Sequence, residues 1–139
     1  MRSVWMATAI ALLAVAPLTL ALSQEASRQS ERRVLRLTRD ALTTGIVNRE
    51  PIDSATVFPP SVGALYYFTE LEAASTAARI IHIWYYRDQK VAEFPLAVEA
   101  LRWRTWSRKQ IPENQIGPWK VEVVGPDGTV LSSRTFDVH

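Results

Sequence analysis

The chain has 139 residues, of which 47% are hydrophobic and 22% are charged, a composition typical of one folded domain and not of a disordered chain. It contains no cysteine and only two histidines, which excludes disulfides, thiolate chemistry and histidine-rich metal sites. Five glycines without a glycine-rich phosphate loop argue against a nucleotide-dependent enzyme, and a net charge of +2 does not favour nucleic-acid binding. We therefore expect no cofactor, no metal ion, no nucleic-acid partner and no catalysis.

The N-terminal residues 4–22 form an uncharged apolar segment that follows Arg2 and ends at a small-residue site near Ser23. Residues 1–23 are therefore expected to be a cleaved signal peptide or a retained transmembrane anchor, since the segment is long enough to cross the hydrocarbon core. Arginines between positions 28 and 39 oppose export of an uncleaved helix under the positive-inside rule, but the first residues after the segment carry no positive charge. We favour a periplasmic or otherwise extracytoplasmic domain, tethered to the inner membrane by residues 4–22 if they are not cleaved.

The rest of the chain divides into a polar stretch and a strand-rich domain. Residues 24–40 are expected to form a polar linker or a short helix. Residues 41–139 alternate β-branched and aromatic residues with turn formers. Strands are expected at 42–48, 64–71, 79–86, 90–98, 101–108, 118–124 and 129–138, with a short one near 56–58. This pattern predicts an all-β fold, an antiparallel β-sandwich of Ig-like architecture preceded by an N-terminal hydrophobic helix.

The register of the hairpin over residues 79–98 decides which side chains of its first strand are buried. A two-residue turn would bury Ile83 and its alternate neighbours, whereas a three-residue loop would bury Trp84 and its alternate neighbours. Alternation alone leaves both registers open. In the next expected strand, Leu101 and Trp103 alternate with arginines and are expected to be buried.

Several segments, taken in order, resemble the bacterial domain-of-unknown-function family 2914. They are TGIVNREP at 44–51, LYYFTEL at 65–71, HIW at 82–84, VAE at 91–93 and RWRTWS at 102–107. The likeness covers roughly residues 41–138 and implies a small β-rich module, often attached to an N-terminal membrane segment, without an established activity. In the family pattern polar residues flank the tryptophan that follows the histidine, whereas Ile83 and Tyr85 stand there in this chain. The departure suggests that a partner or a second layer covers that face, and the resemblance favours an inward-facing His82 and Trp84.

The first candidate binding surface is a row of residues that alternate along one expected strand: Arg102, Arg104, Trp106 and Arg108. Arginine and tryptophan are enriched at the hot spots of protein interfaces, although a solvated strand face is the alternative interpretation. If the row binds a partner, charge reversal at Arg102 and Arg104 should release that partner without unfolding the domain. Ile83 and Tyr85 are the second candidate surface.

Two further patterns bear on function. Glu70 and His82 lie on expected neighbouring strands and could form a carboxylate–imidazole pair, but a structural core histidine is the alternative, since catalysis would need a third group and a cleft. The many aromatic residues, Trp106 above all, suggest a carbohydrate-binding module as the alternative function. The favoured function is a non-catalytic envelope module that contacts another protein, as an accessory or stabilising subunit of a membrane or envelope complex.

Overall fold

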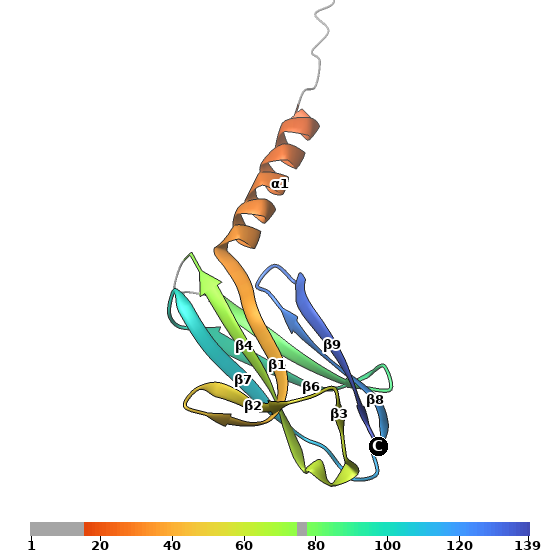
Figure 1. Cartoon of the computed structure of the whole chain (residues 1–139). Coiled ribbons are helices and arrows are strands. Elements are labelled where there is room, and N and C mark those ends of the chain that lie inside the picture. The colour runs from red at the N-terminus through yellow and green to blue at the C-terminus, as the bar shows by residue number, and fades with distance from the viewer. Residues whose placement is uncertain (1–15, 75–77) are drawn as a thin grey trace, which may run out of the picture.

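The computed structural model describes residues 16–74 and 78–139 (Figure 1). In chain order its elements are α1 (Ala16–Val34), β1 (Leu35–Val47), β2 (Glu50–Ser54), β3 (Val57–Phe58), the 3₁₀ helix η1 (Pro60–Val62), β4 (Ala64–Ala73), β5 (Ala78–Tyr86), β6 (Gln89–Val98), β7 (Arg102–Gln110), β8 (Gly117–Val124) and β9 (Val130–Val138).

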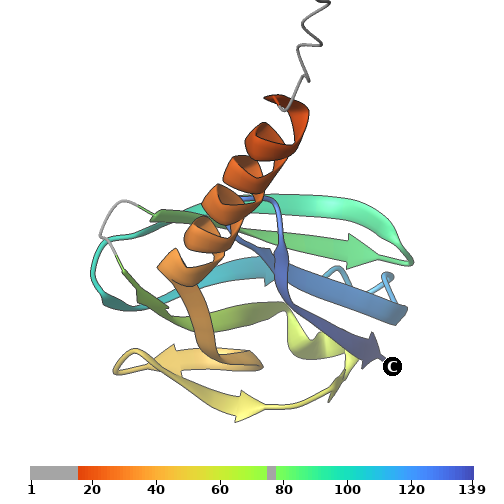
Figure 2. The same ribbon diagram turned by 90° about the horizontal axis from the view of Figure 1, so that it is seen from above.

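The strands form two sheets that pack face to face. The four-stranded sheet has the order β2-β1-β4-β7, and the five-stranded sheet has the order β3-β9-β8-β5-β6. The described neighbours pair in antiparallel fashion except for the two-residue strand β3, which runs parallel to β9. The predicted β-sandwich with a preceding helix is therefore confirmed (Figures 1 and 2).

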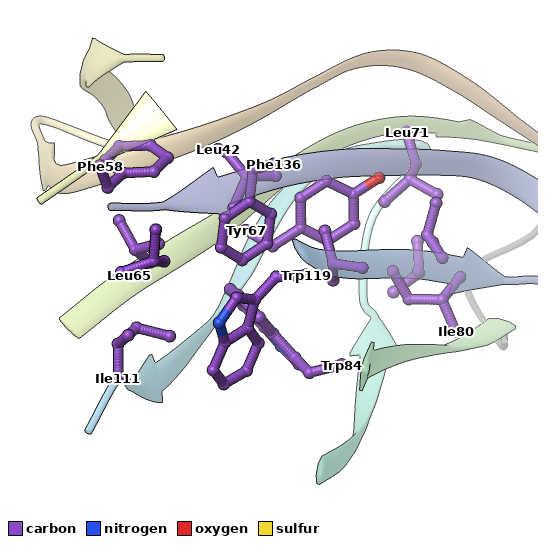
Figure 3. Packing of buried hydrophobic residues seen from close by; sticks show 14 of the residues in the cluster. Leu42, Phe58, Leu65, Tyr67, Leu71, Ile80, Trp84, Ile111, Trp119 and Phe136 are labelled. Carbon is purple, nitrogen blue, oxygen red and sulfur yellow. The ribbon is translucent and has the colours of Figure 1, made fainter. Parts of the chain in front are cut away.

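The core between the sheets is rich in aromatic side chains (Figure 3). Trp119 stacks on Phe136 with ring centroids 5.9 Å apart, and Trp84 meets the same ring edge-on at 6.2 Å. Tyr67 of β4 covers this group from the other sheet and is fully buried. Burial of each such side chain stabilises the fold by about 1.5–3 kcal/mol, so the domain holds together without disulfides.

The β5–β6 hairpin combines a two-residue turn with a bulge. Arg87 and Asp88 form the turn with φ of 46° and 63°, and Val91 is the extra residue that lies between the pairs on either side of it. The bulge shifts the register by one residue, so His82 and Trp84 face the core. Their expected inward orientation is confirmed, although a bulge and not a longer loop produces it.

Three details of the strand assignment differ from the prediction. β1 begins at Leu35, inside the expected linker, because Leu35 is buried and the strand pairs with β4 from this residue onward. β2 was not expected because Pro51 indicated a break; it is an edge strand, where a proline is tolerated. Leu101 precedes β7 and is 58% exposed, since the chain turns there between the two sheets.

The helix α1 runs away from the sandwich and leads directly into β1 (Figure 2). Its side chains from Leu18 to Arg28 are all exposed. It includes only the end of the apolar segment expected at 4–22, whose residues 4–15 lie outside the described part of the chain. No helix within residues 16–74 and 78–139 combines the length and the apolar character that a bilayer crossing requires.

Candidate functional site

The residues of the first candidate surface face outward from the four-stranded sheet. Ser107 of β7 points into the core, where its hydroxyl contacts His82 and Trp84. Because successive side chains of a strand point to opposite faces, the even-numbered residues of β7 face the outside. The alternation therefore places four predicted residues on one face: Arg102, Arg104, Trp106 and Arg108.

This outer face contains a carboxylate that arginines cover almost completely. The side chain of Glu70 on β4 is 4% exposed. Its Oε1 accepts hydrogen bonds from Nε and Nη2 of Arg102 at 2.9 and 2.8 Å. Its Oε2 accepts from Nη2 of Arg39 at 2.8 Å and from Nε of Arg104 at 3.2 Å. Since Arg39 lies on β1 and Arg104 on β7, the carboxylate joins the central strand to both of its neighbours.

A second carboxylate, Glu50 at the start of β2, completes this cluster. It forms ion pairs with Nη1 of Arg39 at 2.8 Å and with Nη1 of Arg104 at 2.7 Å. With Thr38, the residues of the cluster line a shallow, open hollow of about 330 Å³. The cluster holds three arginines and two glutamates, so its net charge is positive.

The arginines stabilise the ionised form of both carboxylates. The hydrogen bond from Arg102 is the largest influence on Glu70 and outweighs the opposing effect of burial; with Arg39 and Arg104 it lowers the pKa of Glu70 to about 2. The hydrogen bond from Arg39 lowers the pKa of Glu50 as well. Both glutamates are therefore charged at neutral pH and fix the guanidinium groups in place.

The β1–β2 hairpin lies on the outer side of the four-stranded sheet, on the side of the molecule away from β5 and β6 (Figure 2). Its turn residues Asn48 and Arg49 have φ of 51° and 61°, as in a type I′ turn. The guanidinium of Arg49 lies 5.1 Å from the ring centroid of Trp103, and its Nη2 donates a hydrogen bond to the carbonyl of Arg104 at 3.1 Å. The tip of the hairpin thus holds the open edge of β7 at Arg104.

The other two residues of the row have fewer contacts. Trp106 lies opposite Phe68 of β4 and is half-buried. Arg108 lies opposite Tyr66 and is exposed, and its side chain makes no hydrogen bond or ion pair within the described residues. Arg102 and Arg104 hold Glu70, so charge reversal there would disturb folding and binding together. Arg108 is the position at which the two effects can be separated.

The second candidate surface lies on the opposite face of the molecule. Ile83 and Tyr85 point outward from the five-stranded sheet and are half-buried. The Nζ of Lys120 lies 4.3 Å from the ring centroid of Tyr85, whose hydroxyl donates a long hydrogen bond of 3.4 Å to Glu122. The structure therefore does not bring the two candidate surfaces together.

His82 is a structural histidine with both ring nitrogens bonded inside the core. Its Nε2 lies 3.2 Å from Oγ1 of Thr69, and its Nδ1 lies 2.8 Å from Oγ of Ser107. The Thr69 hydroxyl donates to a backbone carbonyl, which assigns the proton of His82 to Nε2 and makes Ser107 the donor to Nδ1. Burial lowers the pKa of His82 to about 3, so the ring is neutral at pH 7.

The possible pair of Glu70 and His82 is not formed. Thr69 faces the core and Glu70 faces outward, because they are successive residues of β4. The alternative of a core histidine is confirmed. No group of histidine, aspartate and glutamate side chains in the described residues is arranged to hold a metal ion.

Asp40 was not singled out from the sequence, although it joins the two sheets. Its Oδ2 accepts hydrogen bonds from the hydroxyls of Tyr67 at 2.7 Å and Ser132 at 2.9 Å, and Arg134 of β9 binds both carboxylate oxygens. Burial alone would raise the pKa of Asp40, but hydrogen bonds from Arg134 and the two hydroxyls outweigh it and lower that pKa. Asp40 is the last residue of the expected linker, 24–40, so its place in a strand was not predicted.

Comparison with known proteins gives a similarity to one family and names no activity. No curated protein matches the chain. One family, described as "Protein of unknown function (DUF2914)", matches residues 77–138, which correspond to β5–β9. The motifs at 44–51 and 65–71 lie outside the matched segment. Over residues 77–138 the chain is thus similar to the DUF2914 family, as the sequence motifs predicted.

Proposed function

We propose that the chain is a non-catalytic module that binds a partner protein on the outer face of its four-stranded sheet. The observation that carries this proposal is the arginine cluster around Glu70, in which a covered carboxylate fixes three guanidinium groups. These groups bind a carboxylate in a defined geometry, and their side chains remain between 31% and 71% exposed. Arginines held in this way are suited to recognising the acidic groups of a protein surface.

The charge balance of the face supports an acidic partner. The side chains of Arg36 and Arg102 are 72% and 71% exposed although each bonds to a glutamate. The arginines that β1 and β7 contribute to the outer face outnumber its glutamates: Arg36, Arg39, Arg102, Arg104 and Arg108 oppose Glu50, Glu70 and Glu72. An approaching acidic surface would therefore be attracted, and it would gain hydrogen bonds without ordering flexible side chains first.

The absence of catalysis is part of the proposal. His82 is enclosed in the core with a pKa of about 3, and its two nitrogens bond to hydroxyls, so it is not available to exchange protons with a substrate. The aromatic side chains of residues 16–74 and 78–139 are all buried or half-buried, which gives no flat exposed platform for a sugar ring. We therefore favour binding of a partner protein over binding of a glycan as the function of the module.

We further propose that the module works outside the cytoplasm, as an accessory or stabilising subunit of a membrane or envelope complex. The apolar residues 4–22 are the reason, whether they are a cleaved signal or an anchor. The described part of α1 projects from the sandwich, so a tether of this kind leaves both sheets accessible (Figure 1). Intact mass measured on the membrane and periplasmic fractions separates the two cases.

Partner capture with charge-reversal variants tests the contact. Arg108→Glu reverses an exposed charge on the proposed face, and Arg79→Glu makes the same change on β5 of the other sheet. Both variants should keep their free energy of unfolding within about 0.5 kcal/mol, since neither position is buried. Affinity capture from the native cell envelope, followed by quantitative mass spectrometry, should lose the partner with Arg108→Glu and keep it with Arg79→Glu. Equal recovery with both variants would refute the proposed face.

A further inference from the structure

The open edge of β7 differs from the other outer edges of the two sheets. β2 contains Pro51, β3 has two residues, and β6 contains Pro95 and the bulge at Val91. Proline, bulges, short length and charged side chains are the usual features that prevent an edge strand from pairing with another chain, and β7 has only the last of these. β7 has nine residues, contains no proline, glycine or register shift, and within the described part of the chain pairs with β4 only.

The backbone groups at this edge can be assigned from the observed hydrogen bonds. The carbonyl of Arg104 bonds to Arg49 and therefore points away from β4. Backbone groups of an antiparallel strand alternate between its two sides, so the N–H and C=O groups of Trp106 and Arg108 point away from β4 as well. The hairpin occupies the edge at Arg104, and among the described residues no strand lies beside the part from Trp106 to Gln110. The carbonyl of Gln110 accepts a hydrogen bond from Nζ of Lys109 at 2.6 Å, so the free backbone groups are those of Trp106 and Arg108.

Beneath this edge the other sheet has incompletely buried apolar side chains. Ser107 of β7 lies over His82 and Trp84 of β5, whose partners on the edge strand β6 are Phe94 and Ala92. Phe94 and Ala92 pack against the core yet are only half-buried, whereas His82 and Trp84 are fully buried. A further strand beside β7 would therefore cover apolar surface as well as pair with the backbone.

We propose that β7 is a docking edge at which an extended segment of the partner protein adds as a further strand, with acidic and apolar residues in alternation. The inference rests on the proposed function, because it uses the same basic outer face. The outward side chains of the added strand would lie beside Trp106 and Arg108, where a carboxylate pairs with the unengaged guanidinium. Its inward side chains would cover Phe94 and Ala92.

A second copy of the chain does not fit this edge. Antiparallel pairing of the open parts of two β7 strands, from Trp106 to Gln110, would be centred on Arg108 and would place this residue opposite its own copy. Like charges directly opposite each other destabilise a strand pair. The acidic segment of a different protein is therefore the occupant to which the proposal commits.

The experiment measures binding of a dye-labelled peptide to the full chain in detergent by fluorescence anisotropy. The probe is an extended peptide of about eight residues with alternating glutamate and valine, and the control peptide has lysine in place of glutamate. We expect the acidic peptide to bind and the basic one to bind about tenfold more weakly or not at all. Failure of the acidic peptide to bind at about 1 mM would overturn the inference.

Backbone pairing is tested separately from charge. Arg108→Ala removes the side chain, whereas Arg108→Pro also removes the N–H that faces the open edge, a change that an edge strand tolerates. Arg108→Pro should bind the acidic peptide about tenfold more weakly than Arg108→Ala. Equal affinities of two folded variants would overturn strand addition.

Methylated peptides give a second measurement that does not depend on the stability of Arg108→Pro. In an extended peptide the N–H groups of every second residue point to the same edge, and only one edge would face β7. Methylation of the backbone nitrogens at the odd-numbered or at the even-numbered peptide residues should therefore abolish binding, and methylation of the other set should not. Equal effects of both sets would contradict the inference. If peptide binding fails while Arg108→Glu still releases the native partner, the proposed contact stands and only strand addition is wrong; retention of the partner by Arg108→Glu refutes the contact itself.

Discussion

Replacing Glu70 by glutamine removes the negative charge at the centre of the arginine cluster and keeps nearly the same side-chain shape. In the protein this carboxylate accepts four hydrogen bonds from three arginines of two neighbouring strands. An amide oxygen can accept some of these bonds, but only Arg39 and Arg104 then keep an ion pair, with Glu50. The substitution therefore measures what the charge of Glu70 contributes to folding.

The magnitude follows from the pKa of Glu70, which is lowered from 4.5 to about 2. At 1.36 kcal/mol per pKa unit this shift corresponds to at most about 3 kcal/mol of stability at pH 7. Water reaches the cluster, because the side chains of Arg39, Arg102 and Arg104 remain between 31% and 71% exposed, and it reduces the contribution. We expect Glu70→Gln to lower the free energy of unfolding by about 2 kcal/mol at pH 7.

Urea denaturation of the wild type and the variant between pH 7 and pH 2.5 gives the comparison. Because the pKa of Glu70 is lower in the folded than in the unfolded chain, its contribution is complete above about pH 4.5 and is lost as the pH falls towards 2. The difference between the two proteins should shrink over this range and also in about 1 M salt.

Glu72→Gln is the matched control, since Glu72 is half-exposed and bonds to one largely exposed arginine, Arg36. It should cost less than about 0.5 kcal/mol. A cost for Glu70→Gln no larger than for this control, or a cost that is the same at pH 2.5 and pH 7, would refute the reasoning.

Three further substitutions test other parts of the structure. Burial lowers the pKa of His82 to about 3, so between pH 6.5 and pH 3 the unfolded chain takes up its proton first and stability falls with falling pH. His82→Gln should remove this part of the pH dependence in urea titrations, and an unchanged slope would contradict a neutral core histidine. Asp40→Ala leaves the buried hydroxyl of Tyr67 without its acceptor and should lower the free energy of unfolding by about 3 kcal/mol, which thermal unfolding would detect; unaltered stability would mean that water replaces the bond. Gly117→Ala should cost about 1–2 kcal/mol in the same assay, because φ is 103° and the new Cβ would lie 2.9 Å from Nη2 of Arg87; a neutral effect would show that the backbone relaxes there.

The sequence was sufficient where alternation within one strand decides burial. Trp119 and Val121 are buried as their alternation with charged neighbours indicates, and β5 through β9 lie within two residues of their expected bounds. It was not sufficient where a single residue changes the register. The composition of β6 does not indicate a bulge at Val91. The inward orientation of His82 was therefore predicted from the family resemblance and not from the alternation of residues along the hairpin.

The arginine cluster shows why ion pairs between residues far apart in the chain cannot be predicted from one sequence. Glu70 is separated from Arg39 by 31 residues and from Arg102 by 32, and only the register of β1, β4 and β7 brings the three together. Alternation correctly placed Arg102 on the outward face. The partner of Arg102 depends on which strand lies next to β7, and alternation carries no information on strand order.

The arginines of this face have two separate roles: Arg102 and Arg104 belong to the cluster around Glu70, and Arg108 is free to contact a partner. Apolar residues at positions 70, 102 and 104 could hold the strands together equally well, because replacement of a covered ion-pair network by well-packed apolar groups is often neutral or stabilising. The network adds a fixed orientation, since Glu70 holds guanidinium groups whose side chains remain between 31% and 71% exposed. Side chains that are already ordered lose less entropy when they bind. The fixed arginines therefore form the ordered part of the proposed contact. Arg108 lies outside the network on the open edge, so its substitution can change the affinity for the partner without changing the stability of the fold.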